Sequence, residues 1–118
     1  MKITDRSSGD VTIIDVLGKV VFGEGEEEFR RVASGLIESG RVKLVLNLAE
    51  VPYVDSAGIS EIVRVYVTAS KRGGQMKLLS LTRRVQEVLT ITKLLTVFET
   101  FDSEDEAVAS FGGSPQGA

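Results

Sequence analysis

Residues Lys43 to Ile59 have the sequence KLVLNLAEVPYVDSAGI, and this stretch decides the fold that we expect. Its opening run, KLVLNL, is almost continuously apolar, which is typical of a central strand covered on both faces. A proline interrupts the pattern, so residues 49–56 are predicted to form a loop or an irregular strand extension. A helix is then predicted over Ala57–Arg72, because apolar residues recur at helical spacing and Gly73-Gly74 follow as a stop signal.

The chain after this helix continues to alternate between strand and helix patterns. Met76–Leu81 is predicted as a strand, and Thr82 as the N-cap of a helix that ends at about Thr92. Val97–Glu99 is predicted as a last short strand. The capping-box pattern Ser103-x-x-Glu106 then predicts a final helix that buries Ala107, Val108 and Phe111.

A β-hairpin and a helix are predicted upstream of the central strand. Val11–Val16 and Lys19–Phe22 are apolar and β-branched, and Gly18 between them permits a tight turn. Apolar residues at helical spacing over Phe29–Ile37 predict a helix that Gly40 ends. The resulting order, ββαβαβαβα, predicts an α/β domain with a mixed, mainly parallel sheet, an opening hairpin and about four helices.

Composition excludes many kinds of chemistry. The chain has 118 residues, which is enough for one domain at residues 1–111, and we expect GGSPQGA at 112–118 to be a disordered tail. The chain contains neither cysteine nor histidine, which excludes disulfides, cysteine nucleophiles, Ser-His-Asp triads and nearly every catalytic zinc site. We therefore assign no catalytic residue, no metal site and no cofactor.

Charge and hydropathy limit the partners and the location. A net charge of −3 has the wrong sign for binding the phosphate backbone of nucleic acids. No apolar run approaches the ~18 residues of a membrane-spanning helix. The sequence MKITDRSSGDV at the start lacks the apolar core of a secretory signal. We therefore expect a cytoplasmic protein with no membrane insertion and no direct contact with nucleic acid.

The candidate functional residues lie where the central strand passes into the following helix. Ligands gather at such turns in open α/β sheets, and helix N-termini favour anions. One hypothesis is that Ser56 is an exposed hydroxyl that accepts a phosphate. The alternative is that Asp55 or Ser56 only caps the helix, and spacing alone favours this alternative. Gly58 lacks a side chain, so another backbone segment can approach closely there.

The same helix predicts a surface for a partner. Ile59, Ile62, Val63 and Tyr66 are predicted to face the core. This leaves Ser60, Glu61 and Arg64 on the exposed face, beside the start of the helix. The candidate partner-binding residues are therefore Asp55, Ser56, Ala57, Gly58, Ser60, Glu61 and Arg64.

The pattern resembles the STAS domain, specifically the free-standing anti-sigma factor antagonists of bacteria. The specific element is V-D-S-A-G-I at Val54–Ile59. Further support comes from the V-L-N-L strand at Val45–Leu48, the turn and strand at Gly73–Leu78, and E-x-E-A at Glu104–Ala107. The resemblance implies a STAS fold and a protein–protein switch that is not an enzyme.

In the family that the chain resembles, the serine in the position of Ser56 is phosphorylated by an anti-sigma factor that is also a serine kinase. The resemblance implies that the unphosphorylated protein binds this anti-sigma factor and releases a sigma factor. It further implies that a PP2C-type phosphatase resets the switch. An alternative stays open, in which a STAS subunit regulates a lipid-transport ABC system or a stress-signalling complex.

Two segments depart from the family pattern. The family often has an acidic residue after the glycine that ends the first strand, whereas this chain has Lys19–Phe22 with no acid. Lys93 stands where the family has a glycine after the third helix, which predicts an altered helix exit.

A receiver domain would also alternate strands and helices, but it needs an acidic pair after its first strand, and none follows Leu17.

Overall fold

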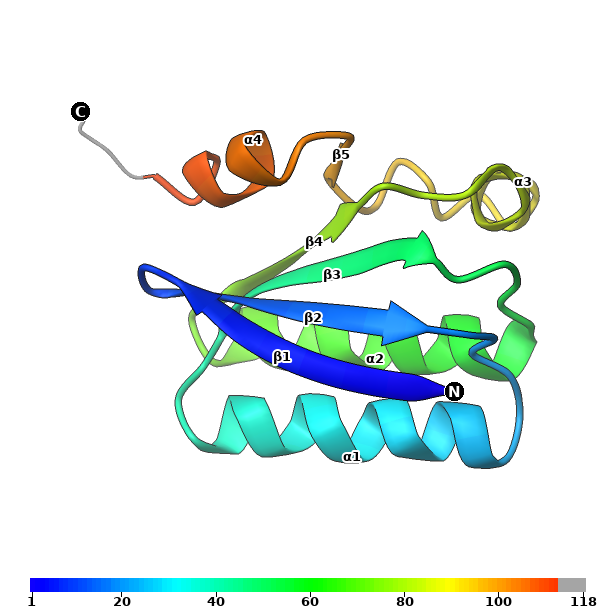
Figure 1. The fold of residues 1–118 in the computed structure, drawn as a ribbon, viewed down its shortest axis with the longest axis horizontal. Helices are drawn as coiled ribbons and strands as arrows, with labels where there is room; N and C mark the ends of the chain where they lie inside the picture. The colour runs from blue at the N-terminus through cyan, green and yellow to red at the C-terminus, as the bar shows by residue number, and fades with distance from the viewer. Residues whose placement is uncertain (113–118) are drawn as a thin grey trace.

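The computed structural model describes residues 1–112, and this part of the chain forms a five-stranded sheet with four helices (Figure 1). The sheet order is β1-β2-β3-β4-β5; β1 and β2 are antiparallel and the other neighbours are parallel. The predicted mixed, mainly parallel α/β fold with four helices is confirmed. The strands are β1 (Lys2–Ser8), β2 (Val11–Leu17), β3 (Lys43–Glu50), β4 (Gln75–Leu79) and β5 (Thr100–Phe101). The helices are α1 (Glu24–Glu38), α2 (Ser56–Lys71), α3 (Arg83–Ile91) and α4 (Glu104–Ala109).

The opening hairpin lies earlier in the chain than predicted. It pairs β1 with β2 from Lys2↔Leu17 to Ser8↔Val11, around a turn in which Gly9 has φ 63. The predicted strand at Lys19–Phe22 is wrong, because Gly18 at φ 102 turns the chain away from the hairpin. Strand β1 was not predicted because it is an edge strand of mostly polar residues and has no apolar run.

The core lies on both faces of the sheet. Helices α1 and α2 cover one face, and α4 covers part of the other (Figure 1). The larger cluster joins β2–β4 to α1 and α2, and α3 adds Val85 and Leu89 to it. The smaller cluster lies under α4 and contains Val11, Ile13, Val45, Leu79 and Ala107. Because β3 is covered on both faces, its sequence is nearly continuously apolar, as predicted.

Strand ends differ from the prediction where the backbone turns. Ser80 has φ 57, so β4 ends at Leu79 rather than Leu81. The last strand is Thr100–Phe101 rather than Val97–Glu99, because Phe98 is drawn inward and buried against Tyr66, with ring centroids 5.0 Å apart. Both expected helix caps are confirmed: Thr82 accepts from the backbone N of Val85, and Ser103 from that of Glu106.

The altered exit predicted for α3 is wrong. Lys93 adopts the left-handed conformation that a glycine favours, with φ 62. Lys93 N donates to Thr90 O at 3.1 Å, and Leu94 N donates to Leu89 O at 2.8 Å. These two bonds form the Schellman ending of a helix. The helix therefore ends with the ordinary Schellman geometry although the residue is lysine, and the left-handed conformation of Lys93 costs backbone strain.

The end of the described chain follows α4 directly. Gly112 N donates to Ala109 O at 3.0 Å, so Gly112 belongs to the end of this helix. The rest of the expected tail, residues 113–118, lies outside the described residues. None of the helices within residues 1–112 is both long enough and apolar enough to cross a membrane.

Candidate functional site

Ser56 is the first residue of α2, and it is exposed as predicted. The N-cap of this helix is Asp55, whose Oδ1 accepts a hydrogen bond from Gly58 N at 2.9 Å. The capping function therefore belongs to Asp55, and the Ser56 hydroxyl lies at the surface beside it. The role of Ser56 as a phosphate acceptor stays a prediction.

Both carboxylate oxygens of Asp55 accept hydrogen bonds from the backbone. Oδ2 accepts from Phe22 N at 2.9 Å, while Oδ1 accepts from Gly58 N. Partial burial acts to raise the pKa of Asp55, but these backbone N–H groups outweigh it and hold the pKa below its ordinary value. Asp55 is therefore ionised at neutral pH, and it serves as a structural joint rather than as a free base.

Gly58 lies against the backbone of the segment that follows β2. Val20 N donates to Tyr53 O, Asp55 N donates to Val20 O, and Val20 forms an isolated parallel bridge with Val54. A Cβ on Gly58 would overlap the carbonyl oxygen of Val20. The expected close backbone approach is confirmed, but the backbone belongs to this chain. Gly58 is buried, so its assignment as a residue open to a partner is corrected.

Glu61 is also buried, and the prediction that it reaches outward is wrong. It is 7% exposed, and its Oε2 lies 3.2 Å from Arg30 Nε of α1 and 3.4 Å from Arg64 Nε. Arg30 also contacts Glu26, at 2.6 Å. The carboxylate of Glu61 thus joins α2 to α1. The sequence did not reveal this because the partner Arg30 lies on a different helix.

The remaining assignments on α2 divide between surface and core. Ser60 and Arg64 are exposed and Ala57 is half-buried, so these residues stay available to a partner. The core positions of the helix are Ile59, Ile62, Val65 and Ala69, whereas the predicted core residues Val63 and Tyr66 are only half-buried. A contiguous surface therefore starts at Ser56 and continues along the exposed face of α2.

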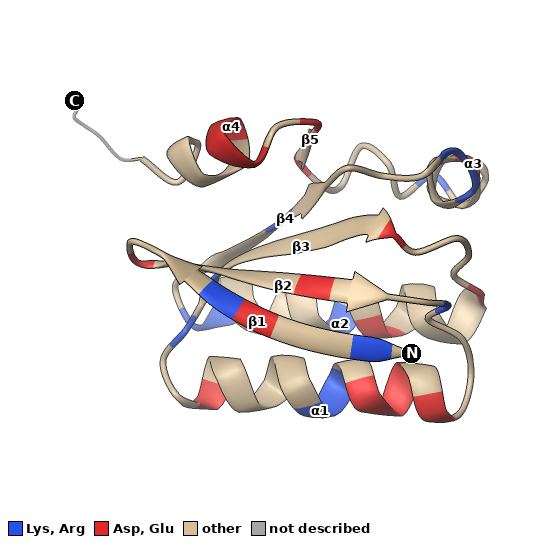
Figure 2. Cartoon of the chain, viewed as in Figure 1, with Lys and Arg blue, Asp and Glu red and all other residues tan. Residues whose placement is uncertain are grey.

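Phe22 is a surface residue that the sequence analysis missed. Its sequence pattern predicts a strand, but Phe22 lies in the turn into α1 and is 79% exposed. The signal was present, because a short apolar run between two glycines beside an acidic helix start favours a loop. Glu24, Glu26 and Glu27 occupy the first turn of α1, and the ribbon at this end of the helix carries the red of acidic residues in Figure 2.

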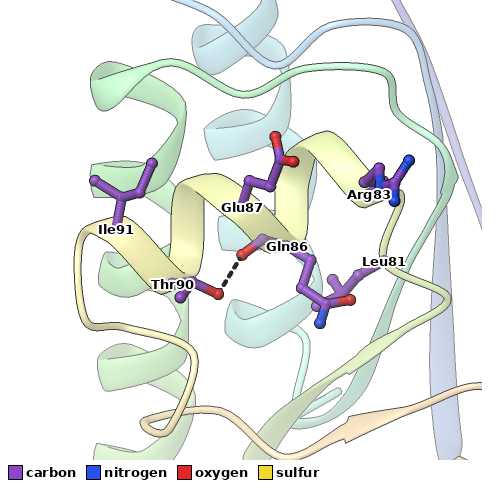
Figure 3. Close-up of a pocket in the computed structure, with 6 residues that line it drawn as sticks. All are labelled: Leu81, Arg83, Gln86, Glu87, Thr90 and Ile91. Carbon is purple, nitrogen blue, oxygen red and sulfur yellow. Dashed lines mark hydrogen bonds between the residues drawn. The ribbon is translucent and has the colours of Figure 1, made fainter.

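A surface groove of about 740 Å³ lies elsewhere, along α3 (Figure 3). One helix and the residue preceding its cap form this groove, and Thr90 Oγ1 simply donates to Gln86 O at 2.8 Å. Catalytic and ligand sites instead bring polar groups together from several elements. None of the predicted site residues lies there. The lining residues are Leu81, Arg83, Gln86, Glu87, Thr90 and Ile91.

A hairpin-led mixed sheet, with two helices on one face and an aspartate-capped helix that presents a serine, defines a STAS-type domain. The model of the STAS domain family matches residues 2–107, and the chain belongs to this family. It is 29% identical over 112 residues to BtrV of Bordetella bronchiseptica, which is named as an anti-sigma factor antagonist, with 94% of this chain and 95% of BtrV covered.

Solved structures agree with this assignment. The anti-sigma factor antagonist TM1081 of Thermotoga maritima superposes with a TM-score of 0.86 at 25% identity, covering 92% of this chain and 93% of that one. The phosphorylated form of SpoIIAA from Bacillus, named as a cell fate determinant, gives a TM-score of 0.73 at 17% identity, covering 92% and 98%. At this identity the likeness to SpoIIAA shows the fold alone.

Proposed function

We propose that this protein is a cytoplasmic anti-sigma factor antagonist that is switched by phosphorylation of Ser56. In its unphosphorylated form it binds an anti-sigma factor that is also a serine kinase, and thereby releases a sigma factor. The observation that carries the proposal is the exposed Ser56 hydroxyl at the start of α2, beside an Asp55 that already caps the helix. The protein itself acts as a binding module and substrate, without a cofactor.

The phosphoryl transfer uses the hydroxyl of Ser56 and ATP held by the kinase. Ser56 Oγ attacks the γ-phosphorus, the Oγ–P bond forms, and the bond from the γ-phosphorus to the bridging oxygen of ADP breaks. The hydroxyl proton goes to a base of the kinase, because the backbone N–H groups that bind Asp55 lower its pKa and make it a weak base. A PP2C-type phosphatase reverses the modification by hydrolysis, which returns the hydroxyl and releases inorganic phosphate.

Electrostatics explain how this modification would switch binding without unfolding the domain. A phosphoserine adds about −1.5 to −2 charges next to the ionised Asp55. The positive end of the α2 dipole offsets part of this repulsion within the chain. A partner surface that fits a neutral hydroxyl does not offset the added negative charge, so phosphorylation weakens binding. SpoIIAA, which has the same fold and exists in a phosphorylated form, is consistent with this.

The test is incubation of the protein with ATP and the anti-sigma factor kinase of the same organism, followed by mapping of the modified residue. We expect phosphate on Ser56, none on Ser56→Ala, and wild-type incorporation on Ser60→Ala, which removes an exposed hydroxyl one turn away. Phosphate on Ser60 or Thr68 would contradict the proposal. If the protein binds no kinase but binds a lipid-transport ABC subunit or a stress-signalling complex stably, that protein takes the place of the anti-sigma factor as its partner.

A further inference from the structure

Phe22 is an exposed aromatic residue on a fixed backbone. The residue is 79% exposed. Its own N–H is bound by Asp55 Oδ2, and on either side of it Val20 N donates to Tyr53 O and Glu26 N to Val21 O. An exposed apolar residue is common in itself and requires no explanation. Here, however, the surrounding hydrogen bonds hold the segment in one conformation and present the ring to solvent.

The position of Phe22 is tied to that of Ser56. Val20 and Val54 form a parallel bridge, and Phe22 and Ser56 each follow two residues after it. Asp55 lies between them, with one oxygen on the N–H of Phe22 and the other on the first turn of α2. Asp55 therefore holds the backbone of Phe22 beside the start of α2, and a protein that covers Ser56 comes close to Phe22.

We propose that Phe22 is the anchor of the partner-binding surface and that its ring enters an apolar pocket of the anti-sigma factor beside Ser56. This inference rests on the proposed function and specifies the chemistry of its partner. Aromatic residues are enriched in the buried centres of interfaces, where a few residues supply most of the affinity. Because the backbone of Phe22 is already ordered, little conformational entropy is lost when the ring is buried.

The anchor also explains the sensitivity of binding to phosphate. A phosphate on Ser56 keeps a strongly held shell of water next to Phe22. Entry of the ring into an apolar pocket would remove part of this shell, and desolvation of a charged group without a partner is costly. The phosphate thus acts on the same pocket that the ring occupies, and the two effects on affinity are coupled.

The experiment compares Phe22→Ala with Ile91→Ala. Ile91 is the matched control, because this residue is also 79% exposed but lies on α3, away from Ser56. We expect Phe22→Ala to bind the purified anti-sigma factor kinase at least tenfold more weakly by isothermal titration calorimetry, at an unchanged melting temperature. Ile91→Ala should stay within twofold of wild type. If the wild-type protein binds the kinase but Phe22→Ala lowers the affinity by less than twofold, this inference is overturned and the proposed function still stands.

A second variant reports the environment of the ring directly. The chain contains no tryptophan, so Phe22→Trp introduces a single reporter. We expect its emission, after subtraction of the kinase spectrum, to shift to shorter wavelength in the complex, while that of Ile91→Trp stays unchanged. An unshifted Phe22→Trp emission in a formed complex overturns the inference. If the wild-type chain binds none of the anti-sigma factors of its organism, the proposed function itself fails, and this inference fails with it.

Discussion

Asp55 accepts a hydrogen bond from the backbone N of Phe22 at 2.9 Å, and this contact ties the segment after β2 to the start of α2. The two residues are far apart in the chain, and no local pattern links them. The same carboxylate caps α2 through Gly58. One side chain therefore fixes the position of both Phe22 and Ser56, which are exposed residues at the start of the candidate surface.

Removal of this joint is expected to destabilise the domain. Asp55→Ala loses the cap and leaves Phe22 N without its acceptor, which should lower the free energy of unfolding by about 1–3 kcal/mol. Asp55→Asn retains one oxygen for the cap, so its loss should be smaller, about 1 kcal/mol. Urea denaturation of the three proteins measures the difference. A wild-type midpoint for Asp55→Ala would show that the joint contributes nothing to stability.

Gly58 and Gly35 form a matched pair of glycines within helices. A Cβ at Gly58 would overlap Val20 O, so Gly58→Ala should cost about 1–3 kcal/mol through overpacking. A Cβ at Gly35, on the exposed side of α1, would meet no atom within 4 Å. Gly35→Ala should therefore stabilise the protein by about 0.5–1 kcal/mol. Opposite shifts in melting temperature are expected, and equal shifts would refute the packing assigned to Gly58.

Arg6 should make stability depend on pH in the acid range. It contacts Asp15 and Glu104 at 2.7 Å each, and its hydrogen bonds hold the pKa of both carboxyl groups below their ordinary values. Both groups therefore bind protons more readily in the unfolded chain, so their contribution is complete at neutral pH. It is lost as the pH falls below about 4. Because Arg6 is half exposed, each pair should contribute only about 0.2–1 kcal/mol.

The measurement for Arg6 is the unfolding free energy of the wild type and Arg6→Gln between pH 7 and pH 3. The wild type should lose more stability than the variant across this range, so the two curves should converge in acid. Arg41→Gln is the control, because Arg41 is equally exposed but lies 3.7 Å from its partner Asp5. Parallel curves for wild type and Arg6→Gln would contradict the expectation.

Lys93 offers a stabilising substitution. It occupies the left-handed position at the end of α3, where a side chain is strained and glycine is not. Lys93→Gly should therefore raise the free energy of unfolding by roughly 1 kcal/mol. Thr92→Gly, at the preceding right-handed position, should give no such gain. A lower melting temperature for Lys93→Gly would mean that the lysine side chain makes a compensating contact.

The elements with strong local signals could be predicted from the sequence. The apolar run of β3, the spacing of α2 and the caps at Thr82 and Ser103 depend on neighbouring residues, and the structure confirms them. The polar edge strand β1 has no such signal, because most of its residues are exposed and only Ile3 packs against the main core. Its pairing with β2 was therefore missed.

The candidate site could be predicted only in part, for a similar physical reason. The exposure of Ser56 follows from its place at a helix start, which the sequence contains. The burial of Glu61 follows from Arg30 on α1, and the placement of Phe22 from Asp55, which lies beyond β3. Contacts between distant segments depend on the packing of whole elements, so local periodicity does not reveal them.

The polar character of β1 has a consequence for the behaviour of the protein at high concentration. An edge strand presents unpaired backbone groups that can recruit a second sheet and start an aggregate. Lys2, Asp5 and Arg6 place charges of both signs along this edge, so the approach of another strand would bury them. At the opposite edge β5 spans only Thr100–Phe101 and offers little template. Both borders of the sheet thus discourage open-ended polymerisation.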